Sequence, residues 1–169
     1  MSKSVGAQVR AQWARLKDVP GGKRLFSYMI GRMAPYTGTI GALVDTLEPG
    51  YAKVVLKDRK KVRNHLRSVH AIALMNLGEV STGLAVLSGM PDDARGILAG
   101  LSMDYHKKGR GTLTAECRCE VPETSDRQEY SIIGEIRDSD GELVATATAR
   151  WLIGPMKTSP ETASDSAAA

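Results

Sequence analysis

The second half of the chain alternates apolar and polar residues with a period of two. The alternation runs through residues 97–105, 112–121, 128–137 and 143–153. Because successive side chains of a strand point to opposite faces, it predicts four antiparallel strands, each with one buried face. In the first strand that face comprises Ile97, Ala99, Leu101, Met103 and Tyr105. Turn residues at 107–109 and 138–141 predict hairpin connections.

Two shorter strands are predicted upstream, at residues 39–47 and 51–57. They are separated by the turn sequence Glu48-Pro49-Gly50. The buried face of the second strand comprises Ala52, Val54 and Leu56, which alternate with a more mixed face. The chain is therefore expected to supply six strands, two before and four after a long apolar segment.

That apolar segment, residues 69–88, is the least polar part of the chain. Its length and its Ala and Leu content favour a helix that is apolar nearly all round, so it must be buried on most sides. We expect Ser68 to cap its start and Gly89-Met90-Pro91 to end it. The order of elements favours an α+β fold, in which an antiparallel sheet wraps around one long buried central helix.

The N-terminal segment, residues 1–35, predicts extra helices. Apolar residues recur at helical spacing in 5–18, and a second short helix is expected at 23–33. These helices either pack on the edge of the domain or form a lid over a pocket, and packing is the commoner role. We expect the main domain to span 36–154 and a disordered tail to follow at 155–169, which is rich in Pro, Ser, Thr and Ala.

The composition narrows the class of protein. Hydrophobic residues make up 42% and charged residues 25% of the 169 positions, as in an ordinary globular domain. A net charge of +4 is too small to indicate a nucleic-acid binder. A disulfide between Cys117 and Cys119 would be strained, so we expect reduced thiols in a cytoplasmic protein. We expect no metal site, signal peptide or membrane span, and the sequence contains no nucleotide-binding glycine motif.

Glu79 is the one ionisable residue between positions 71 and 88. A carboxylate in a helix that is apolar all round is costly unless it is paired, protonated or used in chemistry. Burial raises the pKa of a carboxyl group towards the range in which a general base works well. The structural alternative is that Glu79 faces solvent or pairs with a strand arginine such as Arg118.

Polar residues crowd the approach to this helix, in the sequence Arg63-Asn64-His65-Leu66-Arg67-Ser68-Val69-His70. The free amides and the dipole of a helix N-terminus favour negative charge, so a carbonyl bound there is polarised and its oxyanion stabilised. Asn64 is a candidate for orienting substrate or water, and His70 for contacting substrate. Both residues also have an ordinary structural interpretation, in which each bonds to nearby backbone.

Together these features resemble the hotdog-fold thioesterases, in particular the phenylacetic-acid-pathway thioesterases and the related uncharacterised DUF4442-like family. The resemblance rests on an Asn, a His six residues later and an acidic residue nine further on, here Asn64, His70 and Glu79. The predicted order of strands and central helix over residues 36–153 is also similar to that of the family.

The resemblance implies an acyl-CoA or acyl-carrier-protein thioester as substrate, and a homodimer or homotetramer with sites at the subunit interface. Glu79 would act as general base or nucleophile, the backbone amides of Ala71 and Ile72 as the oxyanion hole, and Asn64 as the residue that positions water. No cofactor is implied beyond the coenzyme A of the substrate. Many family members have two glycines where this chain has Ala71 and Ile72, and the branched Ile72 narrows the approach to the backbone.

A basic loop before the helix fits a coenzyme A ester. Its candidates for binding the phosphates are Arg59, Lys60, Lys61 and Arg63. Such a run of charge is also typical of a solvated loop. The low aromatic content, 5%, favours an aliphatic acyl chain. The sequence thus predicts an acyl-CoA thioesterase. The alternatives are a non-catalytic acyl-thioester or fatty-acid binding module, and a hydratase or dehydratase, which usually relies on a His–acid pair placed differently.

Overall fold

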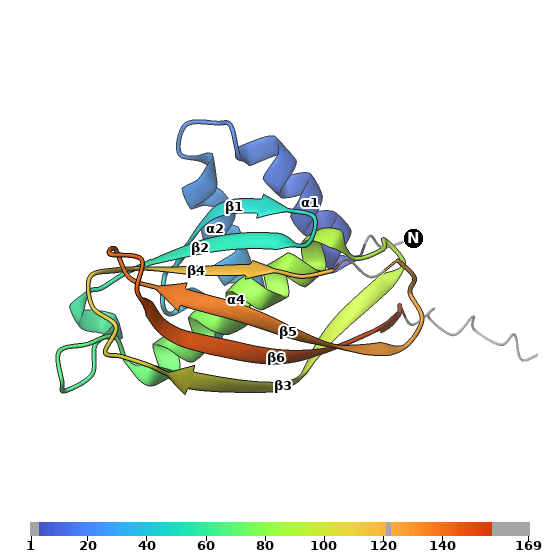
Figure 1. Cartoon of the computed structure of the whole chain (residues 1–169). Coiled ribbons are helices and arrows are strands. Elements are labelled where there is room, and N and C mark those ends of the chain that lie inside the picture. Colours follow the sequence, from blue (N-terminus) through green and yellow to red (C-terminus); the bar gives the residue numbers. More distant parts are fainter. Residues whose placement is uncertain (1–3, 121–122, 157–169) are drawn as a thin grey trace, which may run out of the picture.

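The predicted strands form one six-stranded antiparallel sheet. In the computed structural model, which describes residues 4–120 and 123–156, the strand order is β1-β2-β4-β5-β6-β3 (Figure 1). The strands are β1 (Leu43–Glu48), β2 (Tyr51–Lys57), β3 (Ala94–Tyr105), β4 (Thr112–Arg118), β5 (Gln128–Arg137) and β6 (Leu143–Pro155). The curved sheet wraps around helix α4 (Ala71–Gly89), which confirms the hotdog fold expected from the sequence.

Helix α4 is enclosed because it has almost no polar face. By length and composition it could cross a membrane, but 72% of its apolar window is buried inside the protein. Core packing therefore accounts for its hydrophobicity. Gly78 lets the helix lie close to the sheet, since a Cβ there would come within 2.6 Å of the Ala147 side chain on β6.

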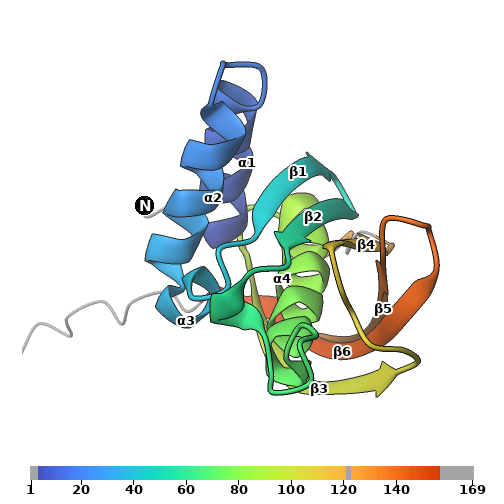
Figure 2. The same cartoon turned by 90° about the vertical axis from the view of Figure 1, so that its left-hand side faces the viewer.

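Three N-terminal helices cover part of what the sheet leaves open. They are α1 (Val5–Leu16), α2 (Gly22–Met33) and α3 (Pro35–Gly38). Figure 2 shows α4 between these helices on one side and the curved sheet on the other. The α1–α2 pair is held by Trp13 and Phe26, whose rings meet edge to face at 5.0 Å. Helix α2 covers the outer edge of β1, where the Ser27 hydroxyl accepts the Val44 N–H at 2.8 Å.

Helix α1 also caps the C-terminus of α4. The guanidinium of Arg10 donates to the carbonyl oxygens of Leu87 at 3.1 Å and Met90 at 2.9 Å, and it pairs with Asp92. The last carbonyls of a helix have no hydrogen-bond donor within the helix and carry partial negative charge. A cation at this end both donates hydrogen bonds to them and offsets the charge. Gly6 gives the close approach, because a Cβ at that position would lie 2.7 Å from the Leu87 carbonyl oxygen.

Most predicted core faces are confirmed. Buried core positions include Ala52, Val54, Leu56, Leu113, Ala115, Cys117, Ile132, Ile136, Ala145, Ala147, Ala149 and Trp151. Cys119 packs against the same core, and both cysteines are free. Val121, predicted on this face, and residues 157–169 of the predicted tail lie outside the described residues. Strand β6 continues to Pro155, which pairs with Ala94.

Three of the strand predictions are wrong. A β-bulge between Leu98 and Gly100 shifts the register of β3, so the buried side changes along the strand. Leu98 packs against the core before the bulge and Leu101 after it, while Ile97 is 50% exposed and Ala99 also faces solvent. The predicted hairpin at residues 107–109 is a crossover, because β3 pairs with β6 at the far edge while β4 lies between β2 and β5. Strand β1 also begins later than predicted, since α3 and a turn occupy residues 35–42.

We predict that Arg10→Met lowers the free energy of unfolding by roughly 1–3 kcal/mol, because two carbonyls at the buried end of α4 lose a charged donor. Urea unfolding followed by circular dichroism measures the change. Arg15→Met is the matched control, since Arg15 is exposed on the same helix. Equal stability of the Arg10 and Arg15 variants would contradict the capping role.

Candidate active site

Glu79 lies half-buried on α4 with no ion-pair partner among the residues that the structure describes. Desolvation by burial raises the pKa of its carboxyl group above the ordinary value. The proposed pairing with Arg118 does not occur, because that guanidinium stacks 4.5 Å from the centre of the Tyr51 ring on β2. The carboxyl group is therefore desolvated without compensation by a cation.

Glu79 belongs to a narrow strip of α4 that the rest of the chain leaves partly open. Ile72, Met75 and Glu79 follow one another at helical spacing, and Ile72 is 49% exposed. The neighbouring Gly78 faces Met103 of β3, so the strip lies on the side of α4 near the β3 edge of the sheet. The open strip combines apolar side chains with one carboxyl group.

The start of α4 is capped by His70, and the prediction that Ser68 caps it is wrong. The ring Nδ1 of His70 accepts the Ile72 N–H at 3.1 Å. Ser68 is buried instead, and its hydroxyl donates to Asn64 Oδ1 at 3.1 Å. The hydroxyl is thus used inside the loop and cannot reach the helix amides. An acceptor Nδ1 places the proton of the neutral ring on Nε2.

Asn64 organises the loop that leads to His70. Its side-chain oxygen also accepts the N–H groups of Leu66 at 2.9 Å and Ser68 at 3.2 Å. Arg67 adopts a left-handed conformation, φ 56°, within this tight loop. Asn64 thus shapes the loop that precedes the helix, and its predicted role towards water stays a prediction.

The amides of Ala71 and Ile72 stand at the first turn of α4, as the predicted oxyanion hole requires. The Ile72 N–H is already bonded to His70, whereas the amide of the first helical residue, Ala71, has no carbonyl four residues earlier in the helix. The Tyr105 hydroxyl donates to the Ala71 carbonyl at 3.0 Å, and burial raises the pKa of Tyr105. Sequence reasoning missed Tyr105 as a neighbour of this site, because the alternation of β3 assigns it only to a face.

The two ends of the predicted catalytic set are far apart within one chain. Ala71 and Glu79 are eight residues apart on a helix, which corresponds to about 12 Å along its axis. A thioester carbonyl bound at the first-turn amides is thus out of reach of the carboxyl group on the same helix. One chain therefore carries the predicted oxyanion site and the carboxyl group at two separate places.

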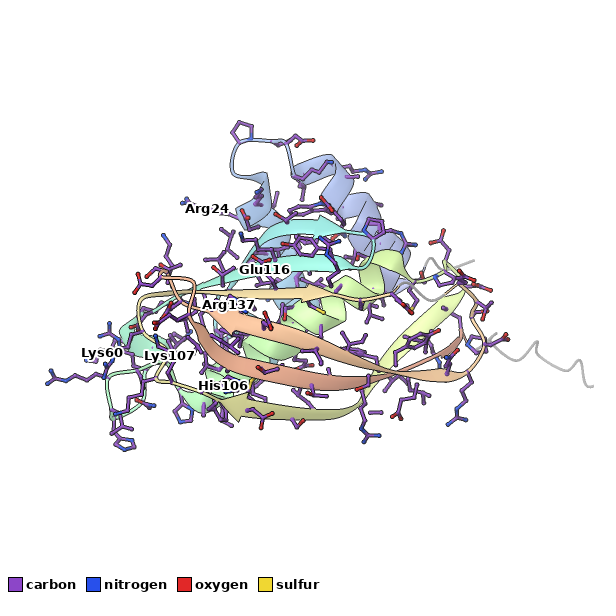
Figure 3. All side chains as sticks on the ribbon, in the orientation of Figure 1. Arg24, Lys60, His106, Lys107, Glu116 and Arg137 are labelled. Atoms are coloured by element: carbon purple, nitrogen blue, oxygen red, sulfur yellow. The ribbon has the colours of Figure 1, made fainter. Side chains whose placement is uncertain are left out.

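The basic loop is partly committed to structural contacts. Arg63 pairs with Asp58 at 2.6 Å and lowers the pKa of that carboxyl group, while the Arg59 guanidinium donates to the Ile40 carbonyl. Lys60 and Lys61 lie in a short 3-10 helix, Lys60–Val62, and are exposed. Figure 3 shows Lys60 projecting from this loop, away from the body of the protein. Two of the four predicted phosphate ligands are therefore free to bind an anion as they stand.

A cleft of about 840 Å³ lies beside α2, between α2–α3 and β1–β2. No pattern in the sequence indicates this cleft, since its walls come from three separate segments. Val80 of α4 contributes to its lining, but Glu79 does not. The cleft is thus distinct from the open strip of α4 that carries the carboxyl group.

Comparison with known proteins agrees with this architecture. The family model described as "Domain of unknown function (DUF4442)" matches residues 22–153. A search of curated proteins gave no significant match.

Several solved structures share the fold. The protein named genomics APC5556 has 26% identity and a TM-score of 0.77, and the alignment covers 88% of this chain and 99% of that one. A Pseudomonas aeruginosa protein of unknown function, named a probable thioesterase, has 22% identity and a TM-score of 0.71, with coverage of 82% and 97%. A phenylacetic acid degradation-related protein from Ralstonia eutropha, named as a candidate thioesterase, has 22% identity and a TM-score of 0.59, with coverage of 70% and 89%. The family match over residues 22–153 shows that this protein belongs to the DUF4442 family, and the solved structures share its hotdog fold.

Proposed function

We propose that the protein is an acyl-CoA thioesterase, which hydrolyses an acyl thioester to the free acid and coenzyme A with Glu79 as its catalytic carboxylate. The observation that carries the proposal is the state of Glu79. It is the one carboxyl group on α4, it is half-buried, and desolvation raises its pKa without a cation to offset the cost. Nothing in the packing of α4 requires an acid there, and a base of raised pKa suits hydrolysis near neutral pH.

The chemistry needs a base and an oxyanion site. As general base, the Glu79 carboxylate takes a proton from water while the hydroxide adds to the thioester carbonyl carbon. The first-turn amide of Ala71 holds the resulting oxyanion. When the tetrahedral intermediate collapses, the C–S bond breaks and the thiolate takes the proton from Glu79. As nucleophile, Glu79 would instead form a mixed anhydride that water then cleaves.

The active site on this account contains residues from two copies of the chain. Because about 12 Å separates the helix start from Glu79 on one helix, a second α4 running the opposite way would bring one protomer's Glu79 to its partner's Ala71. The edge of β3 offers the means, since within the described sheet β3 pairs with β6 alone. Edge-to-edge pairing of two β3 strands related by a twofold axis sets the two helices antiparallel. The assembly is thus a homodimer or a tetramer built from such dimers.

The open strip suggests the kind of acyl group. Ile72 and Met75 share this strip with Glu79, and their side chains, of which that of Met75 is flexible, favour an aliphatic chain over an aromatic ring. Free Cys117 and Cys119 agree with a cytoplasmic location, where thiols stay reduced.

The runner-up function is a binding module of the same fold that holds an acyl thioester or a fatty acid without turnover. It would keep the apolar strip but would not need Glu79. A hydratase or dehydratase is less favoured, because His70 contacts backbone through Nδ1 and forms no ion pair with a carboxylate in the described part of the chain.

We predict that Glu79→Gln lowers kcat for thiol release by at least about a hundredfold while leaving substrate affinity within a few-fold, because Gln keeps the shape but cannot accept the proton. A thiol-release assay over short, medium, long and aryl acyl-CoA esters measures it and identifies the preferred chain. Full turnover by the Gln variant would contradict the role of Glu79. Binding of the esters with no turnover by the wild type would favour the binding module.

A complementation experiment tests the two-chain site. Ala71→Pro removes the first-turn N–H, and proline fits the first position of a helix; His70 already has the extended ψ of 140° that a following proline requires. Both Ala71→Pro and Glu79→Gln are expected to be inactive alone. Heterodimers of the two contain one intact site, so a co-folded equal mixture should recover about a quarter of wild-type activity.

Ala71→Val, which keeps the N–H at similar size, is the control for the proline variant and should retain activity. If the mixture of Ala71→Pro and Glu79→Gln stays inactive although heterodimers form, both groups act within one chain and the proposed arrangement is wrong.

A further inference from the structure

The cleft beside α2 has a basic wall. Arg24, Tyr28 and Arg32 are spaced four residues apart, so they lie along one face of α2, and all three line the cleft. Lys57, at the end of β2, lines it as well. Ile30, Val44, Val54 and Val80 add apolar lining. The volume, about 840 Å³, lies within the range of about 300–1,000 Å³ that is typical of small-molecule sites.

The positive charges of this wall have no carboxylate partners among the residues that the structure describes. Arg24, Arg32 and Lys57 form no ion pair with any carboxylate in residues 4–120 and 123–156. Asp58 is the one acid among the lining residues described, and its charge is already neutralised by Arg63 at 2.6 Å. Three cations with no counter-charge around one concave surface attract an anion more strongly than the same cations spread over a convex face.

The spacing of the charges selects a polyanion. Arg24 and Arg32 are separated by about 12 Å along the helix axis, with Lys57 opposite on the strand. A single carboxylate, such as that of a fatty acid, would engage one of them and leave the others unpaired. A ligand with phosphates at two positions would engage them together, and guanidinium groups bind phosphate through paired hydrogen bonds.

The aromatic side chain in the middle adds a second feature. Tyr28 stands between the two arginines on the same face of α2 and is 65% exposed, although it is a large ring beside a cleft. An exposed ring between cations offers a stacking surface for a planar base. Arginine, tyrosine and arginine in this order fit a base that carries phosphate groups on its sugar.

We infer that this cleft binds the phosphorylated nucleotide of coenzyme A, with Arg24, Arg32 and Lys57 on the phosphates and Tyr28 on the adenine. The inference rests on the proposed function for the identity of the ligand. It goes further by giving the nucleotide of that ester a binding site of its own, which a carrier-protein thioester, lacking the nucleotide, would not use. It also places the main phosphate contacts on α2 and β2. Arg59 of the basic loop lines the cleft too, but its guanidinium already donates to the Ile40 carbonyl, and Arg63 pairs with Asp58. Figure 3 shows that Arg24 and Lys60 belong to separate parts of the surface.

Calorimetric titration with adenosine 3′,5′-bisphosphate tests the inference without any thioester chemistry. We expect the wild-type protein to bind it with an affinity that falls as salt rises. Arg24→Gln with Arg32→Gln should weaken binding at least about tenfold, because two charge-assisted contacts are lost. Arg15→Gln with Lys17→Gln, which removes the same charge from exposed positions of the α1 region, should bind as the wild type does. Tyr28→Ala should weaken binding several-fold and Tyr28→Phe should preserve it.

Steady-state kinetics gives the second readout. With acyl-CoA the double arginine variant should show a raised KM and an unchanged kcat. With the matching acyl-pantetheine, which lacks the nucleotide, its kinetics should equal those of the wild type.

Absence of nucleotide binding, or equal affinity of the arginine variant and the wild type, would overturn the inference. So would loss of binding on changing Lys60 and Lys61 in place of the two arginines. Nucleotide binding without hydrolysis of any thioester would refute the proposed function and leave the cleft assignment standing. Hydrolysis without nucleotide binding would do the reverse.

Discussion

The burial of α4 is the constraint on which the rest of the structure depends. A helix that is apolar on nearly every side has to be enclosed, and one curved sheet covers only part of its circumference. The N-terminal helices supply further cover, and Arg10 satisfies the carbonyls at the far end of the helix. A buried Asn76 follows the same logic, because its side-chain amide donates to the Tyr36 carbonyl of α3 at 3.2 Å and ties α3 to α4. The additional helices are thus part of what makes the central helix stable.

The candidate reaction site lies on the part of α4 that the sheet and the N-terminal helices leave open. The strip of Ile72, Met75 and Glu79 lies near the free edge of β3, and the first-turn amides lie about 12 Å along the helix from the carboxyl group. Each half is incomplete alone, so the same exposed edge that would join two copies would also complete the reaction site. On the other side of α4, the packing of α2 against the edge of β1 creates the basic cleft. The two features face different sides of one helix, which suits a long ligand with a reactive end and a charged end.

Periodicity in the sequence was sufficient to predict the sheet, the central helix and most buried faces, because these depend on local patterns of two and three to four residues. Periodicity failed where the structure depends on pairing between segments that are far apart in the sequence. The bulge at Leu98–Gly100 depends on the pairing with β6, and the crossover at 107–109 depends on which strand β3 joins. The helix is capped by His70 and not, as the sequence predicted, by Ser68, because the Ser68 hydroxyl is bonded to Asn64 within the loop. Glu79 could be singled out from sequence, since its burial follows from its neighbours in the helix. Tyr105 and the α2 cleft could not, because they arise from contacts between distant segments.

The central claim is that the carboxyl group of Glu79, desolvated on α4, is the base that drives hydrolysis. The most direct measurement is a ¹³C NMR titration of the Glu79 carboxyl group, compared with the pH dependence of kcat/KM. Burial raises the pKa of this group, so both curves should have a rising limb with one shared midpoint above the ordinary value for a glutamate carboxyl group. Activity should rise with pH because the base works only after it loses its proton. A Glu79 that titrates at the ordinary value, or a kinetic midpoint that does not coincide with its titration, would contradict the account.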